Sequence, residues 1–170
     1  MTIRRHLLGI AIAAAALAAA GQACAQTSQS ATGSITVMQP VLNVTKTSDL
    51  SFGSVFRPSS GSGSISIDAN TGAVNASNLS QLNGNTTSRA GFTVEGQPNA
   101  NIYVTYPNSV NLTRSGGSET LTVYLTSSMG GGQISGGGTV TFNIGGQVTL
   151  SSSTVLGAYS NSFTVTVAYN

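Results

Sequence analysis

The segment that most constrains the fold is residues 163–169, in which large apolar side chains alternate with small or polar ones. Phe163, Val165, Val167 and Tyr169 recur at every second position. An extended strand places such residues on one face, whereas a helix, with 3.6 residues per turn, distributes them around its axis. The segment therefore predicts a β-strand with one buried face. We expect the chain to end inside this strand, and the strand to be where a partner acts.

The same period of two recurs along the chain after residue 25. Short alternating runs are separated by Gly, Ser, Asn and Pro, and no stretch keeps a helical period. Strands are predicted at 34–38, 41–46, 50–56, 64–68, 91–95, 101–106, 120–126, 139–144, 147–151 and 160–169. This number and spacing of strands predicts an all-β sandwich or barrel.

The predicted core consists of the apolar residues that alternate within these strands. They are Leu42, Val44, Leu50, Phe52, Ile65, Ile67, Phe92, Val94, Ile102, Val104, Leu121, Val123, Leu125, Val140, Phe142, Val148, Leu150, Phe163, Val165 and Val167. We expect one domain at 39–170, preceded by residues 26–38 as an N-terminal extension or a first strand.

Turns and loops are predicted between the strands from their residue types. Residues 70–72, 96–99 and 116–117 have turn composition, and Asp68 before Asn-Thr-Gly is interpreted as turn chemistry rather than a calcium loop. Gly145-Gly146 is predicted to be a two-residue hairpin turn, because both glycines tolerate a positive φ. The glycine-dense residues 130–138 are predicted to be a mobile loop.

The N-terminal 25 residues have the composition of a signal peptide. Arg4 and Arg5 precede an apolar run at 7–20, and Ala23-Cys24-Ala25 supplies small residues at the cleavage site. We expect cleavage after Ala25. A membrane anchor is the weaker interpretation because a span needs about 20 apolar residues. A lipoprotein acylated on Cys24 is weaker still.

The composition left after cleavage argues against catalysis and nucleic-acid binding. The single His and the single Cys lie in the signal peptide, and the sequence has no Trp. Without Arg4 and Arg5, six Lys and Arg become four, which balance four Asp and Glu. Scattered cations do not make a phosphate-binding patch, and the usual general bases, thiol nucleophiles and zinc ligands are missing. We expect no enzyme activity, no cofactor, no metal and no nucleic-acid partner.

Three segments carry a resemblance to a known family. They are Thr-Gly-Ser-Ile-Thr-Val at 32–37, the stretch 40–53 with its Asp-Leu-Ser-Phe-Gly, and the closing 157–169. Together they resemble a bacterial family of secreted, pilin-like β-sandwich domains of unassigned function, which is similar to fimbrial subunits of the chaperone-usher type. The resemblance covers essentially the whole mature chain. It implies an immunoglobulin-like (pilin-like) sandwich that is completed by a donor strand.

In chaperone-usher pilins the domain lacks its last strand, and the N-terminal extension of a neighbouring subunit fills the gap. Carried onto this sequence, the resemblance implies donor residues Ala31, Gly33, Ile35 and Val37. It implies an acceptor and chaperone-binding edge at Phe163, Val165, Val167 and Tyr169. The implied partners are further copies of the chain in a fibre, a periplasmic chaperone and an outer-membrane usher. The implied route is export through the periplasm to the cell surface, with no membrane anchor in the mature chain.

Other interpretations of the sequence stay open at this point. Residues 34–38 can be the first strand of a sandwich that is complete by itself. The protein can then be a self-contained secreted binding module, for glycans or surface adhesion, with Tyr103, Tyr106 or Tyr124 as an aromatic platform. A small outer-membrane barrel is a further alternative, weakened by strands shorter than the roughly 9 to 11 residues that a spanning strand needs.

Overall fold

The computed structural model describes residues 27–37, 40–82, 84 and 86–170. The expected signal peptide, the cleavage site after Ala25 and Met38 at the end of one predicted strand lie outside these residues. The chain divides into two units, 1–37 and 38–170. The described residues contain no helix long and apolar enough to cross a membrane.

Within the first unit, residues 27–37 form neither helix nor strand, and every side chain is exposed. Ile35 is 87% exposed and Val37 is 85% exposed. The prediction of a strand at 34–38 is therefore wrong for 34–37. Alternation alone does not make a strand, because a strand also needs a neighbour to accept its backbone hydrogen bonds.

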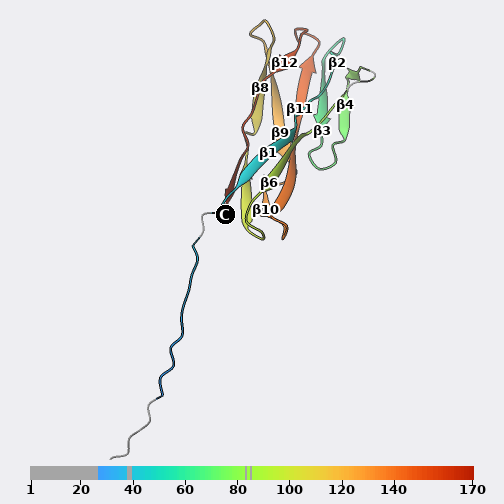
Figure 1. The fold of residues 1–170 in the computed structure, drawn as a ribbon. Coiled ribbons are helices and arrows are strands. Elements are labelled where there is room, and N and C mark those ends of the chain that lie inside the picture. The colour runs from blue at the N-terminus through green and yellow to red at the C-terminus, as the bar shows by residue number, and fades with distance from the viewer. Residues whose placement is uncertain (1–26, 38–39, 83, 85) are drawn as a thin grey trace, which may run out of the picture. The chain divides into compact units, whose positions relative to one another are not determined.

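The second unit is all-β (Figure 1). Its strands are β1 (Asn43–Ser48), β2 (Val55–Phe56), β3 (Ser62–Ile67), β4 (Val74–Ser77), β5 (Ser80–Gln81), β6 (Ala90–Glu95), β7 (Asn101–Thr105), β8 (Ser109–Arg114), β9 (Thr120–Ser127), β10 (Gly131–Gln133), β11 (Thr139–Ser151), β12 (Tyr159–Ser160) and β13 (Thr166–Tyr169). All the strand pairs are antiparallel.

These strands form a large sheet, a small sheet and a short ribbon. The large sheet has the order β1-β6-β11-β9-β8-β12, with β3 added to β11 and β4 to β3. The small sheet has the order β10-β7-β13, and β2 pairs with β5. Buried residues of both sheets belong to one core, including Ile102 of β7, Val94 of β6 and Phe142 of β11. The two sheets therefore pack face to face, which confirms the predicted all-β sandwich.

The predicted core is largely confirmed. Ten of its members are buried: Ile65, Ile67, Val94, Ile102, Val104, Val123, Leu125, Phe142, Val148 and Leu150. The other ten are half-buried and pack against that core. Phe92 stacks on Phe142 with ring centroids 5.2 Å apart. Four further hydrophobic residues are buried that the predicted core did not include, namely Ala69, Ala90, Ile134 and Ile144.

The hairpin predicted at Gly145-Gly146 is wrong, because β11 runs through both glycines without turning. Residues 139–144 of β11 pair with β6, and residues 146–151 pair with β3. A Cβ on Gly145 would lie 2.1 Å from the Ile67 carbonyl oxygen, and one on Gly146 would lie 2.8 Å from that of Tyr124. The glycines are needed for close backbone approach where β11 changes partner, not for a positive φ.

The predicted loop at 130–138 is also partly wrong. Residues 131–133 form β10, and Ile134 is completely buried. Glycine density hid this element because only one large apolar side chain marks it. Strands β4, β5 and β8 also lie outside the strands predicted from the sequence. β8 alternates at Val110 and Leu112 but has no other apolar residue.

The turn interpretation of residues 68–72 is confirmed. The Asp68 carboxylate accepts hydrogen bonds from the Thr71 backbone N–H at 2.7 Å and the Thr71 hydroxyl at 2.9 Å. These bonds stabilise the ionised form and lower the pKa of Asp68. Gly72 has a φ of 76°. The Arg89 guanidinium donates to the carbonyl oxygen of Ala69 at 2.9 Å. This carbonyl oxygen of the loop is therefore already bound by the positively charged Arg89 side chain.

Candidate functional site

Two strands at the ends of their sheets flank the shared core. β1 ends the large sheet and pairs only with β6, while β13 ends the small sheet and pairs only with β7, among the described residues. Each strand therefore has one edge whose backbone groups meet no other described strand. Such edges are templates for an added strand.

The C-terminal residues of β13 lie against the chain segment that precedes β1. The Tyr169 hydroxyl donates to the Val41 carbonyl oxygen at 2.8 Å and accepts from the Gln97 backbone N–H at 2.8 Å. Figure 1 shows the C-terminus beside the start of β1. We call this place the Tyr169 end. At the Tyr169 end, β13 contacts the residues that lead into β1.

Away from the Tyr169 end, the predicted strand 160–169 is broken. Residues 159–160 form β12 on β8, residues 166–169 form β13 on β7, and 161–165 form no strand. No backbone–backbone hydrogen bond joins 161–165 to other described residues. Phe163 and Val165 are nevertheless half-buried on the core, as are Val167 and Tyr169. The one apolar face predicted for this segment is therefore confirmed, although its pairing is not continuous.

An apolar cleft lies next to the residues that precede 161–165 in the chain. It encloses about 570 Å³, and its two walls are residues 50–57, which follow β1, and residues 154–159, which precede the broken segment. Its remaining lining comes from Ile65, Leu112, Leu121, Val148 and Leu150. We call this space the cleft, and the cleft together with the half-buried side chains Phe163, Val165, Val167 and Tyr169 the groove. A cleft of this size is within the range of ligand-binding sites.

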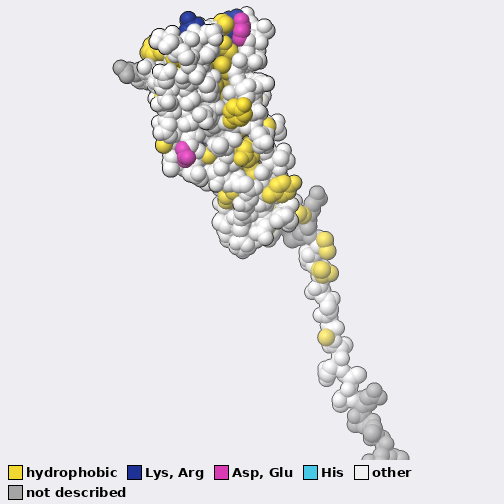
Figure 2. Space-filling view, turned by 180° about the vertical axis from the view of Figure 1, so that it is seen from behind, with side chains coloured by type: hydrophobic (Ala, Val, Ile, Leu, Met, Phe, Trp, Pro, Cys, Tyr) yellow, Lys and Arg dark blue, Asp and Glu magenta, His cyan; other side chains and the backbone are white. Residues whose placement is uncertain are grey.

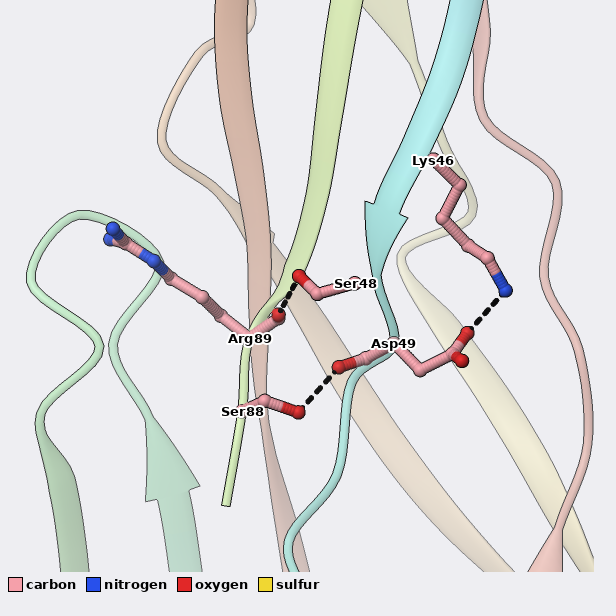
Figure 3. Close-up of polar contacts among 5 residues, drawn as sticks. All are labelled: Lys46, Ser48, Asp49, Ser88 and Arg89. Carbon is pink, nitrogen blue, oxygen red and sulfur yellow. Dashed lines mark hydrogen bonds and ion pairs between the residues drawn. The ribbon is translucent and has the colours of Figure 1, made fainter. Parts of the chain in front are cut away.

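Polar contacts hold the first wall of the cleft on the β6 side (Figure 3). The Ser88 hydroxyl donates to the Asp49 carbonyl oxygen at 2.7 Å, and the backbones of Ser51 and Ser88 exchange hydrogen bonds of 2.8 and 2.9 Å. Lys46 pairs with the exposed Asp49 carboxylate at 2.5 Å, a contact that contributes little because water screens it. The backbone groups of Asp49 and Ser51 thus anchor the wall, and Leu50 and Phe52 of the same Asp-Leu-Ser-Phe-Gly motif line the cleft.

A hydrogen bond joins the two walls at the rim. The Arg57 guanidinium donates to the Thr154 carbonyl oxygen at 2.8 Å. In the second wall, Val155 is 41% exposed and Leu156 is 69% exposed. Large aliphatic side chains of the cleft wall therefore remain in contact with water, and covering them would be favourable.

The four predicted donor residues lie in the first unit and are exposed. A Cβ placed on Gly33 would meet no atom within 4 Å. Ala31, Ile35 and Val37 are likewise exposed. Their role as a donor strand stays a prediction, as does the role of Phe163, Val165, Val167 and Tyr169 as the acceptor edge.

The tyrosines of the alternative binding platform do not form one layer. Tyr103 is on β7 in the small sheet and is 49% exposed, whereas Tyr124 is on β9 in the large sheet and is 64% exposed. Tyr106 is half-buried and packs on the core. As the alternation predicts, Tyr103 and Tyr124 face away from the buried residues of their strands.

Charged side chains are sparse on the face of the molecule in Figure 2. Figure 2 shows one face with few coloured charges among white polar atoms and separate yellow apolar patches. Arg114 donates to the Glu119 carboxylate at 2.7 Å across the turn between β8 and β9; this bond raises the pKa of Arg114 and lowers the pKa of Glu119. Among the described residues, no three His, Cys, Asp or Glu side chains gather as metal ligands.

The fold and groove define an all-β sandwich domain with two unpaired edges over a partly covered core. The chain belongs to the family described as a domain of unknown function (DUF4402), whose model matches residues 42–169. The match covers the second unit from just before β1 to the end of β13. No curated protein and no solved structure matches the chain.

Proposed function

We propose that the protein is a structural subunit of a surface fibre, in which the extension 26–38 of one copy adds a strand to the groove of another. The observation that supports this proposal is the groove, whose half-buried apolar side chains accompany edges of β1 and β13 that pair with no further described strand. Residues 27–37 are exposed and pair with no described strand, and the alternation at Ala31, Gly33, Ile35 and Val37 suits them to be the added strand.

The energetics of the proposal depend on both side chains and backbone. Burying Ile35 and Val37 contributes roughly 3 to 6 kcal/mol, at about 1.5 to 3 kcal/mol each. Each backbone hydrogen bond to a free edge adds about 0.5 to 1.5 kcal/mol. Ordering the extension and bringing two molecules together cost several kcal/mol, so the side chains alone would bind weakly. A continuous strand with bonds on both sides makes the contact durable.

The proposal includes an export route and assembly partners. A subunit with an open groove presents strand edges that aggregate unless they are covered. A periplasmic chaperone that lends a strand to the edge of β13 would protect it, and an outer-membrane usher would exchange that strand for the next subunit's extension. The resemblance to chaperone-usher fimbrial subunits supports these partners and placement at the cell surface.

The test removes the extension and returns it as a peptide. A variant lacking residues 26–38 is expected to form no fibres by electron microscopy, and to gain thermal stability when a synthetic 26–38 peptide is added. A scrambled peptide of the same composition is the matched control. A variant that stays soluble and monomeric, and that the peptide does not stabilise, would instead favour a self-contained binding module that presents Tyr103 and Tyr124.

Gly33→Leu tests the donor role without removing any chain. No described atom lies within 4 Å of the position, so the substitution leaves the isolated subunit folded. Pressed into a neighbour's groove, the added side chain would cost roughly 1 to 3 kcal/mol through overpacking. Fibre yield should fall while the amount of folded subunit stays constant; normal fibres would count against the proposal.

A further inference from the structure

The cleft is lined mainly by apolar side chains and carries one charged group. It encloses about 570 Å³, and large aliphatic side chains reach it from several strands, among them Ile65 of β3, Leu112 of β8 and Val148 of β11. Among the described residues that line it, Arg57 is the only one with a charged side chain. A cavity of this volume with apolar walls and a polar group at its edge is typical of a small-molecule site.

Exposed apolar side chains continue from the cleft onto the β2–β5 ribbon. Phe56, which lies between the cleft residues Val55 and Arg57, is 58% exposed, and Leu82 is 49% exposed. The Leu82 backbone N–H donates to the Ser54 carbonyl oxygen at 3.1 Å, which places Leu82 and Phe56 on the same face of the ribbon. Apolar surface is therefore exposed at the mouth of the cleft as well as inside it, and exposed apolar patches mark binding sites.

The positive charge of Arg57 is not compensated within the part of the chain that the structure describes. Its guanidinium donates to the neutral Thr154 carbonyl oxygen at 2.8 Å and pairs with no described carboxylate. The other described cations each have an acidic neighbour: Lys46 has Asp49, Arg114 has Glu119, and Arg89 has Asp68. A guanidinium has five N–H donors in a planar fork, so Arg57 keeps donors for an anionic group at the rim.

The chemistry of the ligand follows from these two parts of the cleft. The apolar cavity suits a hydrocarbon chain, and one uncompensated guanidinium suits one negative charge. A phosphate monoester carries about 1.5 to 2 charges, which exceeds what a single cation neutralises. We propose that, in the free subunit, the cleft binds the alkyl chain of a fatty acid and Arg57 binds its carboxylate at the rim. This inference goes beyond the proposed function, because it concerns the subunit before a neighbour's extension covers the groove.

The alkyl chain supplies most of the affinity. Each CH₂ group that leaves water increases the binding constant roughly fourfold. The Arg57 side chain is exposed to water, where an ion pair contributes about fivefold at most. We therefore expect affinity to rise with chain length until the cleft is full, and the carboxylate to give a smaller preference over other head groups.

The experiment titrates octanoate and decanoate into the monomeric mature chain, residues 26–170, by isothermal titration calorimetry below their critical micelle concentrations. Decanoate is two CH₂ groups longer, so it should bind roughly tenfold more tightly than octanoate. Decyltrimethylammonium has an alkyl chain of the same length and a cationic head group, and it should bind more weakly than decanoate. Size-exclusion chromatography checks that the protein stays monomeric during the titration.

Two pairs of variants locate the site. Arg57→Gln removes the charge and keeps a donor for the Thr154 carbonyl oxygen; it should weaken decanoate binding about three- to fivefold and should not weaken binding of decyltrimethylammonium. Lys46→Gln, at an exposed cation outside the cleft, is its control and should bind decanoate as the native chain does. Val155→Asp places a carboxylate in the cleft wall and should abolish decanoate binding. Val41→Asp, at an aliphatic residue that is 76% exposed and outside the cleft, is the second control.

The inference is overturned if decanoate shows no saturable binding to the native chain. Equal affinities for octanoate and decanoate, equal affinities for decanoate and decyltrimethylammonium, or decanoate binding that Arg57→Gln and Val155→Asp leave unchanged would overturn it as well. Circular dichroism checks the fold of each variant. If Val155→Asp does not fold, the exposed Arg57→Gln variant still tests the site. The titration needs no fibre, so its result does not depend on whether copies of the chain assemble.

Discussion

Tyr169→Phe tests whether the Tyr169 end holds β13 in place. The substitution keeps the aromatic ring on the core and removes only the hydroxyl that joins Val41 to Gln97, at 2.8 Å from each. Two hydrogen bonds are lost, each with a net value of about 0.5 to 1.5 kcal/mol. Because Val41 and Gln97 are exposed residues, water replaces part of the loss. We expect the free energy of unfolding to fall by about 1 to 2 kcal/mol.

The assay is urea denaturation of the purified subunit, with a thermal scan beside it. For a domain of this size the loss corresponds to a decrease in melting temperature of about 3 to 8 °C. Tyr124→Phe is the matched control, since Tyr124 is 64% exposed and faces away from the core. That control should change stability by less than about 0.5 kcal/mol. Amide hydrogen exchange should also quicken in β13 for Tyr169→Phe alone.

Equal stability losses in the two variants would refute this reasoning. The Tyr169 hydroxyl would then contribute no more to stability than the exposed Tyr124 hydroxyl. β13 would have to be held at the Tyr169 end by packing of the Tyr169 ring. A loss well above 3 kcal/mol would be equally informative, because it would show that the surrounding backbone groups are not reached by water when the hydroxyl is removed.

Two further predictions concern the body of the domain. Gly145→Ala should prevent folding or lower stability severely, because its Cβ would lie 2.1 Å from the Ile67 carbonyl oxygen and 2.7 Å from the Ala69 backbone nitrogen. Soluble yield and circular dichroism measure the effect. A normally folded variant would contradict the prediction. Hydrogen bonds from Thr71 lower the pKa of Asp68 in the folded state, so the carboxylate adds stability that is present above its unfolded pKa of about 3.9 and is lost as pH falls through the folded value. Asp68→Asn should therefore lose less thermal stability than the native chain between pH 7 and pH 3, and an unchanged difference in melting temperature would count against this account.

Local patterns in the sequence were enough to predict the class of fold. Alternation identified β6, β7 and β9 because each carries apolar residues at every second position and ends at a turn former. The turn at 68–72 was predictable for the same reason, since an Asp that caps a tight turn acts within four residues. The apolar face of 163–169 was also predictable, because a side-chain direction depends only on the local extended backbone.

Tertiary structure decided which alternating segments find partners. Residues 34–37 and 163–165 alternate as well as β7 does, but no described strand pairs with them. Gly145-Gly146 has hairpin composition, yet β11 passes straight through it. Both positions are glycine because the backbones of β3 and β9, which pair with β11 here, lie too close for a side chain. Pairing is a contact between residues far apart in the chain, and period-two patterns carry no information on which edge meets which. The cleft exists for that reason: its walls, 50–57 and 154–159, are about 100 positions apart in the sequence, and only the fold brings them together.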